Sequence, residues 1–151
     1  MKIRAYKPED FTEVKNLHLQ TVQTINAQDY SQEQINTWPK LRAEDLENNT
    51  CIVAEKNNTI IGFADMSKET IHRIYTHKNH QKTRIGTKLL KKLEETAKKQ
   101  EITELKLISS TTAKTFYEKH GYTTTKQVST TIQGIKHEDY EMKKHLTSFI
   151  K

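Results

Sequence analysis

Apolar residues recur at helical spacing in two segments of the chain, and each segment follows a signal for a helix start. The apolar face of a predicted helix over residues 85–99 comprises Ile85, Leu89, Leu90, Leu93 and Ala97. A second stripe predicts a helix after Pro8, because proline is favoured in the first turn. That stripe comprises Phe11, Val14, Leu17, His18, Thr21, Val22 and Ile25. Shorter helices are predicted after the capping box of Ser31 and Gln34 and over residues 43–48.

Runs of apolar and β-branched residues between these helices predict the strands of a sheet. The predicted strands cover residues 2–6, 51–56, 59–66, 70–76, 105–108, 122–131 and 135–143, with a helix over 111–120. Asn57-Asn58 and Gln133-Gly134 are turn signals, so each joins a hairpin. A hairpin followed by a strand–helix–strand–helix unit favours an α/β fold with a mixed sheet and helices on both faces.

The length and the cysteine content limit the class of protein. A chain of 151 residues predicts a single domain with a buried core. Cys51 is the only cysteine and lies in a strand that is expected to be buried, so we interpret it as a core residue in a reducing compartment. The chain has neither an apolar run long enough for a membrane span nor a signal peptide pattern. We therefore expect a cytoplasmic protein without a membrane partner.

Basic residues are in excess and cluster around the helix over residues 85–99. The net charge is +6, which is a reason to consider nucleic acid as a partner. That helix has no aromatic residue, so it offers no platform for stacking bases. The charge fits a solvated helix face with a few cations for a phosphorylated ligand better than it fits a nucleic-acid interface.

A polar loop over residues 81–87 leads directly into this helix. A helix start has unpaired N–H groups and the positive end of the helix dipole, and both favour an anion. Lys82, Arg84 and Lys88 add positive charge at the same place. The loop matches neither the P-loop nor the dinucleotide-binding pattern. It predicts a phosphate-binding loop of another kind.

The loop resembles the [QR]-x-x-G-x-[GA] element of the GNAT acyltransferases. Gln81 and Gly86 match that element, whereas Arg84 replaces its usual glycine. The segment 113–122, AKTFYEKHGY, is similar to the family's A-x-x-F-Y-x-K-x-G-[FY] element. Segment 71–80 resembles the strand and turn before the loop, although Lys78 and His80 replace the usual proline and tyrosine of that turn. With the glycine-containing strand at 62–64, the resemblance covers roughly residues 3–143.

The resemblance implies a three-layer fold whose central sheet is splayed between the strand of His72 and the strand of Leu105. Acyl-CoA would lie in that gap, and acetyl-CoA would be the co-substrate. The implied cofactor-binding residues are Ile74, Tyr75, Thr76, Gln81, Lys82, Thr83, Arg84, Ile85, Gly86 and Thr87. No histidine has metal-ligand spacing with cysteine, so we expect no metal.

The resemblance also suggests two catalytic residues. Tyr117 matches the tyrosine that many GNAT enzymes use to protonate the leaving thiolate, although a core tyrosine would occupy the same position. His72 is the candidate base for the amine, since some family members have a catalytic carboxylate in this strand. Asp65 and a chain of ordered water are the alternatives.

Family acceptor sites are built from the first helices and the strand hairpin. The candidate acceptor-binding residues are Tyr30, Gln34, Trp38 and Asp65. The sequence thus predicts a single N-acetyltransferase domain, residues 1–151, that acetylates a primary amine of a small molecule. A tRNA-charged amine, a protein amine and a non-catalytic acyl-CoA-binding domain remain as alternatives. The oligomeric state stays open, a homodimer included.

Overall fold

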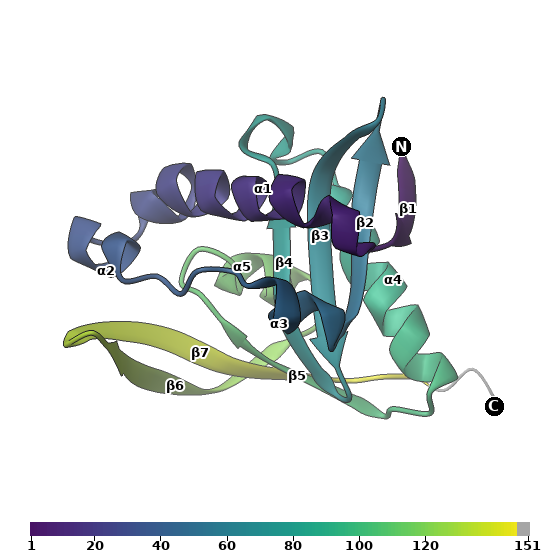
Figure 1. The fold of residues 1–151 in the computed structure, drawn as a ribbon. Helices are drawn as coiled ribbons and strands as arrows, with labels where there is room; N and C mark the ends of the chain where they lie inside the picture. Colours follow the sequence, from purple (N-terminus) through teal and green to yellow (C-terminus); the bar gives the residue numbers. More distant parts are fainter. Residues whose placement is uncertain (148–151) are drawn as a thin grey trace.

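A seven-stranded sheet forms the centre of the computed structural model, which describes residues 1–147 (Figure 1). The strand order is β1-β2-β3-β4-β5-β7-β6. All neighbouring strands are antiparallel except β4 and β5, which are parallel. The strands are β1 (Lys2–Ala5), β2 (Thr50–Lys56), β3 (Thr59–Ser67), β4 (Thr70–Thr76), β5 (Glu104–Ser109), β6 (Thr123–Ile132) and β7 (Ile135–His145). The predicted mixed sheet is confirmed.

Helices cover both faces of the sheet because successive residues of its strands point to opposite sides. On β2, Val53 packs in a core with Val14 and Leu17 of α1 (Phe11–Thr24). The next residue, Ala54, packs in the other core, which contains the apolar face of α4 (Ile85–Lys99). The shorter helices are α2 (Gln32–Asn36), α3 (Ala43–Glu47) and α5 (Lys114–Lys119), and the 3-10 turns are η1 (Pro8–Asp10), η2 (Asn26–Gln28) and η3 (Lys78–His80). The three-layer arrangement that the sequence predicted is present.

Two predicted hairpin turns have the backbone conformation that their residues favour. Asn57 and Asn58 both have positive φ, 52° and 62°, and join β2 to β3. Gln133 and Gly134 have φ of 50° and 80° and join β6 to β7. Two successive residues with positive φ are typical of the type I′ turn, whose twist matches that of the strands.

Some element boundaries differ from the predicted ones. The segment that begins at Pro8 is first a 3-10 turn, and the α-helix starts at Phe11. The helix predicted over residues 111–120 is shorter, because Ser110 and the residues after it form a turn in which the Ser110 hydroxyl oxygen accepts a hydrogen bond from the Ala113 N–H at 3.2 Å. The first regular helical residue is therefore Lys114.

The parallel strands β4 and β5 diverge soon after they start. Their register pairs are Thr70 with Lys106 and Ile71 with Leu107. Among the described residues, the rest of β4, residues 72–76, has no strand paired on this side. The splay thus lies where the sequence predicted it. No helix within residues 1–147 is long and apolar enough to cross a membrane.

Candidate active site

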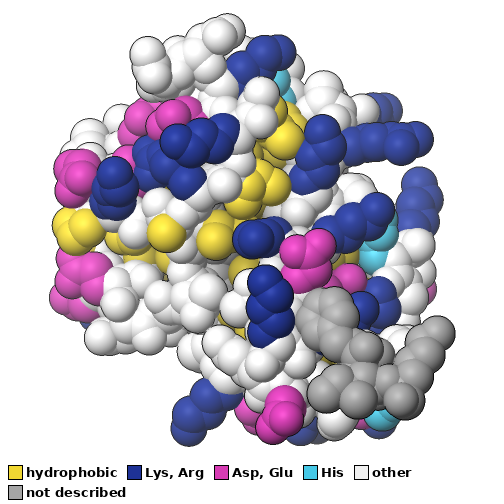
Figure 2. Space-filling model, turned by 90° about the vertical axis from the view of Figure 1, so that its right-hand side faces the viewer, with side chains coloured by type: hydrophobic (Ala, Val, Ile, Leu, Met, Phe, Trp, Pro, Cys, Tyr) yellow, Lys and Arg dark blue, Asp and Glu magenta, His cyan; other side chains and the backbone are white. Residues whose placement is uncertain are grey.

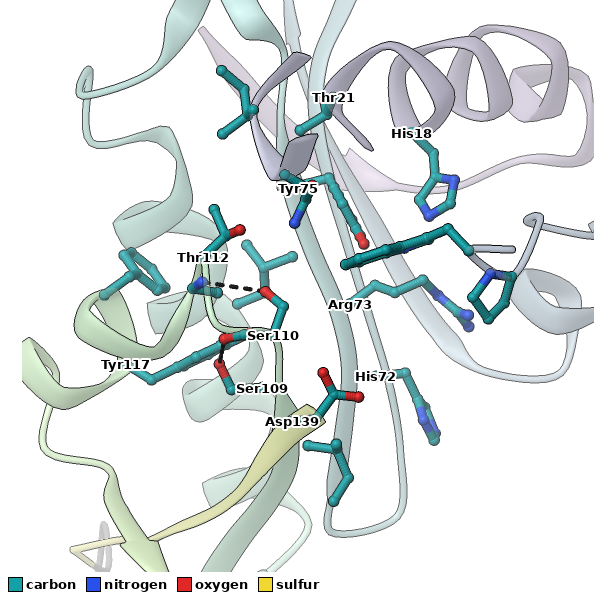
Figure 3. Close-up of a pocket in the computed structure, with 18 of the residues that line it drawn as sticks. His18, Thr21, His72, Arg73, Tyr75, Ser109, Ser110, Thr112, Tyr117 and Asp139 are labelled. Atoms are coloured by element: carbon teal, nitrogen blue, oxygen red, sulfur yellow. Dashed lines mark hydrogen bonds between the residues drawn. The ribbon is translucent and has the colours of Figure 1, made fainter. Parts of the chain in front are cut away.

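A cavity of about 450 Å³ lies where β4 and β5 diverge (Figure 3). One wall comes from β4 and from α1, with Arg73, Tyr75 and His18. The opposite wall comes from the end of β5 and from α5, with Ser109 and Tyr117. Side chains from both sides of the splay therefore face one space.

The start of α4 lies at one end of this cavity. Arg84 is the N-cap residue and has a left-handed conformation with φ of 67°. The first intrahelical hydrogen bond runs from the Lys88 N–H to the Arg84 carbonyl oxygen at 3.0 Å, so the N–H groups of residues 85–87 have no partner within the helix. A Cβ atom on Gly86 would lie 3.4 Å from the Phe116 ring and 3.7 Å from the Thr76 Oγ1. Gly86 therefore lies between β4 and α5, where a side chain would be in ordinary contact with both.

The loop before α4 is fixed to the end of β4 by a side chain. The Gln81 Nε2 donates a hydrogen bond of 2.6 Å to the Thr76 carbonyl oxygen, which also accepts one from the Thr21 hydroxyl at 3.3 Å. The matching glutamine of the motif thus orients the loop.

The ten expected cofactor-binding residues divide into two groups. Ile74, Tyr75, Thr76, Gln81 and Gly86 line the cavity. The others surround the start of α4: Lys82, Thr83 and Arg84 are exposed, Ile85 is buried in the core, and the Thr87 hydroxyl bonds to the His120 ring at 3.1 Å. Ile85 therefore offers only its backbone to a ligand.

Exposed lysines extend the positive charge beyond the loop. Lys88, Lys91, Lys92 and Lys99 of α4 are exposed. Basic side chains are prominent on the face of the molecule that Figure 2 shows. An anion at the start of α4 would therefore meet both the helix dipole and nearby cations.

Tyr117 lies in the wall of the cavity and is only 5% exposed. Burial raises the pKa of its hydroxyl well above the ordinary value of 10.0. Among the described residues, the hydroxyl has no hydrogen-bond partner, so it is a protonated donor without an internal acceptor. The hydroxyl is therefore protonated at neutral pH and can donate a hydrogen bond to a ligand in the cavity.

His72 lies on the opposite side of the cavity from Tyr117 (Figure 3). It is an exposed residue of β4, and its Nε2 is 2.6 Å from the Ser67 hydroxyl oxygen. The structure brings the two expected catalytic residues to the same cavity but not into contact.

Asp65, which was expected at the acceptor, is fully buried and lies in the core rather than in the wall of the cavity. Its carboxylate accepts hydrogen bonds from the Arg73 guanidinium at 3.0 and 2.7 Å and from the Asn49 amide at 2.9 Å. Asp65 therefore holds the Arg73 side chain, which lines the cavity, in place. Its own carboxylate does not line the cavity.

The other three expected acceptor residues have different positions. Trp38 lines the cavity. Tyr30 packs edge-on against it at 4.9 Å between ring centroids, and its hydroxyl oxygen accepts a hydrogen bond from the Thr111 N–H at 2.6 Å. Gln34 does not line the cavity, because its side chain completes the capping box with Ser31 and donates to the Lys136 carbonyl oxygen. The role of Gln34 toward the acceptor stays a prediction.

Asp139, His137 and His18 are among the cavity residues that the sequence analysis did not predict. Asp139 and His137 come from β7, and His18 comes from α1. Burial raises the pKa of Asp139 above its usual range, and burial lowers the pKa of His18 to about 4. The first two share a face of β7 because residues two apart on a strand point to the same side, but the sequence does not show that this face borders the cavity. No group of three or more potential metal ligands was found within residues 1–147.

Comparisons with known proteins agree with this geometry. A family model described as an acetyltransferase (GNAT) domain matches residues 26–144. The chain is 28% identical over 138 residues to an uncharacterized N-acetyltransferase, YafP, of Escherichia coli, and the match covers 89% of each chain. A GCN5-related N-acetyltransferase of Rhodopseudomonas palustris has a similar structure, with a TM-score of 0.89, 25% identity and coverage of 96% of this chain and 95% of that one. The PaiA N-acetyltransferase of Thermoplasma acidophilum, solved with coenzyme A, has a TM-score of 0.78, 23% identity and coverage of 95% and 98%.

Proposed function

Because the chain belongs to the GNAT acetyltransferase family, we propose that it transfers the acetyl group of acetyl-CoA to a primary amine of a small acceptor. The observation that supports this most is the cavity between the diverging strands β4 and β5, with a helix start at one end and Tyr117 in its wall. Such a cavity can hold a long phosphorylated thioester and an amine at the same time.

The cofactor would be bound mainly by backbone groups. The free N–H groups at the start of α4 and the cations of Lys82 and Arg84 would contact the pyrophosphate. The unpaired edge of β4, residues 74–76, would hydrogen-bond to the pantetheine arm and offer an N–H to the thioester oxygen. The structure of PaiA contains coenzyme A, which supports this role for the common fold.

The transfer needs one proton acceptor and one proton donor. The amine nitrogen attacks the thioester carbon, the carbon–sulfur bond breaks, and Tyr117 donates its proton to the leaving thiolate. We propose His72 as the residue that receives a proton from the amine nitrogen as it attacks and passes it to solvent, because its ring borders the cavity and is exposed. Cys51 is buried with a raised pKa, so it is not a candidate nucleophile, and a reducing compartment such as the cytoplasm suits it.

A second candidate function is acyl-CoA binding without catalysis. The observation that favours it is Arg84. Its backbone is left-handed, and it stands at the position where the family motif usually has glycine. An arginine there would crowd the phosphates if its side chain folded over the loop. It would strengthen phosphate binding if its side chain contacted them directly.

One experiment separates these two functions. Thiol release from acetyl-CoA is measured across a broad panel of primary amines, and acetyl-CoA binding is measured by calorimetry on the same preparation. An enzyme releases thiol in an amine-dependent way and yields the acetylated amine in equal amount. Binding without amine-dependent release would favour the second function, and no binding at millimolar acetyl-CoA would contradict both.

A further inference from the structure

Asp139 is the only carboxylate among the residues that line the cavity. It comes from β7, and Figure 3 shows its side chain between the wall with Ser109 and Tyr117 and the wall with His72 and Arg73. Within residues 1–147 it forms no ion pair. A carboxylate that is half-buried without a cation is costly unless a ligand supplies the positive charge.

Arg73, whose side chain lines the cavity, does not neutralise Asp139, because Arg73 is already paired with Asp65. Two nitrogens of the Arg73 guanidinium bond to the fully buried Asp65. His18 also adds no positive charge near neutral pH, since burial holds its pKa at about 4. Neither Arg73 nor His18 is therefore an ion-pair partner of Asp139, and the remaining titratable neighbour on β7 is His137, whose charge lowers the pKa of Asp139.

Aromatic side chains line the cavity together with Asp139 or pack behind its wall. The Tyr30 hydroxyl oxygen accepts a hydrogen bond of 2.6 Å from the Thr111 N–H, which fixes the Tyr30 ring against Trp38. His137 lies two residues earlier on the same face of β7 and bonds to the Thr37 hydroxyl at 2.9 Å. Trp38 packs between the rings of Tyr30 and His137, at 4.9 and 6.1 Å between centroids. Aromatic faces beside a carboxylate are a favourable environment for an organic cation.

We propose that Asp139 binds the ammonium group of the acceptor, and that the acceptor is a cationic amine without a carboxylate near its amino group. This inference rests on the proposed acetyl transfer for its place in catalysis, but the binding site itself does not depend on turnover. The apolar part of the acceptor lies against Trp38. An α-carboxylate would be repelled by Asp139, and the charge of Arg73 is already paired with Asp65.

The proton balance of the transfer gives Asp139 a defined part. The bound ammonium first gives one proton to the Asp139 carboxylate, and the neutral nitrogen then attacks the thioester carbon. As the carbon–sulfur bond breaks, the nitrogen gives its second proton to His72, which passes it to solvent. The thiolate takes the proton of Tyr117, and Tyr117 is reprotonated from solvent. The net products are the amide, free thiol and one proton, which Asp139 releases to solvent.

The test uses matched probes that differ only near the amino group. The probes are 2-phenylethylamine, 2-phenylethanol and phenylalanine, with hexylamine and hexanol as an aliphatic pair. Their binding is measured by calorimetry on the full chain, alone and saturated with coenzyme A, so that no turnover occurs. We expect an amine to bind at least tenfold more tightly than its alcohol and than phenylalanine.

The variants identify the residue that is responsible. Asp139→Asn should weaken amine binding about 10–100-fold, as expected for loss of a charged partner, and leave alcohol binding unchanged. Asp139→Glu should restore part of the amine affinity. Glu138→Gln is the matched control, because it removes one negative charge from the adjacent exposed position of β7 and should change neither affinity. Circular dichroism checks that each variant is folded.

The outcomes distinguish this inference from the proposed function. Amine binding that is lost in Asp139→Asn, with no thiol release on any amine, would support the site and contradict the enzyme. Turnover that is unchanged in Asp139→Asn, or that prefers phenylalanine, would overturn the inference and leave acetyl transfer in place. Absence of amine binding to either form of the native protein would also overturn it.

Discussion

The buried carboxylate of Asp65 and the guanidinium of Arg73 face each other directly across the pairing of β3 and β4. The two residues are register partners, and their side chains share two hydrogen bonds of 3.0 and 2.7 Å. Asp65 is fully buried, whereas Arg73 reaches the cavity. The pair therefore connects the core of the sheet to the wall of the candidate active site.

Removal of one partner from this pair should destabilise the fold strongly. Asp65→Ala leaves the partly buried Arg73 cation without a counter-charge, and we expect a loss of about 3–5 kcal/mol in the free energy of unfolding. Urea denaturation measures it. Glu44→Ala, which breaks an exposed ion pair with Arg42, is the control and should have little effect. A similarly small effect of Asp65→Ala would contradict the structural role of this pair.

Arg84 allows the backbone and the charge of the loop to be tested separately. Its φ of 67° favours glycine, so Arg84→Gly should be more stable than Arg84→Ala by about 1 kcal/mol. Both substitutions remove the cation, and both should weaken acetyl-CoA binding by about 1–3 kcal/mol if the side chain contacts phosphate. Thermal denaturation and calorimetry measure the two effects. If both variants bind acetyl-CoA more tightly, the arginine obstructs the site.

Substitution of Gly86 by alanine should weaken acetyl-CoA binding without destabilising the fold. Gly86→Ala places a methyl group in ordinary contact with the Phe116 ring, and alanine favours a helix by up to about 1 kcal/mol over glycine. The fold should therefore keep its stability. The same methyl group narrows the passage between Thr76 and Phe116, so acetyl-CoA affinity should fall several-fold in calorimetry. Lys99→Ala, at the far end of α4, should leave the affinity unchanged, and an equal loss in both variants would argue against a narrow passage.

His18 should make the protein less stable at acidic pH. Its pKa is about 4 in the folded chain and 6.5 in its ordinary state, so the unfolded chain binds the proton more readily. The contribution of neutral His18 to the free energy of unfolding is fully present above pH 6.5. It is lost as the pH falls toward 4, by about 3 kcal/mol at most. Urea denaturation at several pH values should show this loss in the native protein and a flatter profile in His18→Gln. The exposed His145→Gln should behave like the native protein; if His18→Gln retains the native slope, another group is responsible.

The sequence predicted the features that depend on local pattern and on order along the chain. The hairpin turn at Asn57-Asn58, the capping box of Ser31 and the apolar face of α4 follow from residue types at fixed spacing. The splay between β4 and β5 followed from the family resemblance and is present after Ile71. These features need no knowledge of which distant side chains meet.

The features that were missed depend on contacts between distant segments. Asp139 is one of several acidic residues in a polar strand, and nothing local distinguishes it from Glu138. Asp65 was expected at the acceptor because its strand borders the site, but the bulge that follows it and its pairing with Arg73 turn it into the core. His18 was assigned to the apolar stripe of α1, which is correct, yet the same burial brings it to the cavity.

The most direct test of acetyl transfer in this cavity compares turnover and cofactor binding in one variant, Tyr117→Phe. The substitution removes only a hydroxyl group from a buried ring, so acetyl-CoA affinity by calorimetry should stay within about twofold of the native value. Thiol release with an accepted amine should fall by about 10²–10⁴-fold, the range for a lost general acid. Equal turnover in the native protein and in Tyr117→Phe would contradict the role of Tyr117 as the proton donor and would leave it as a packing residue.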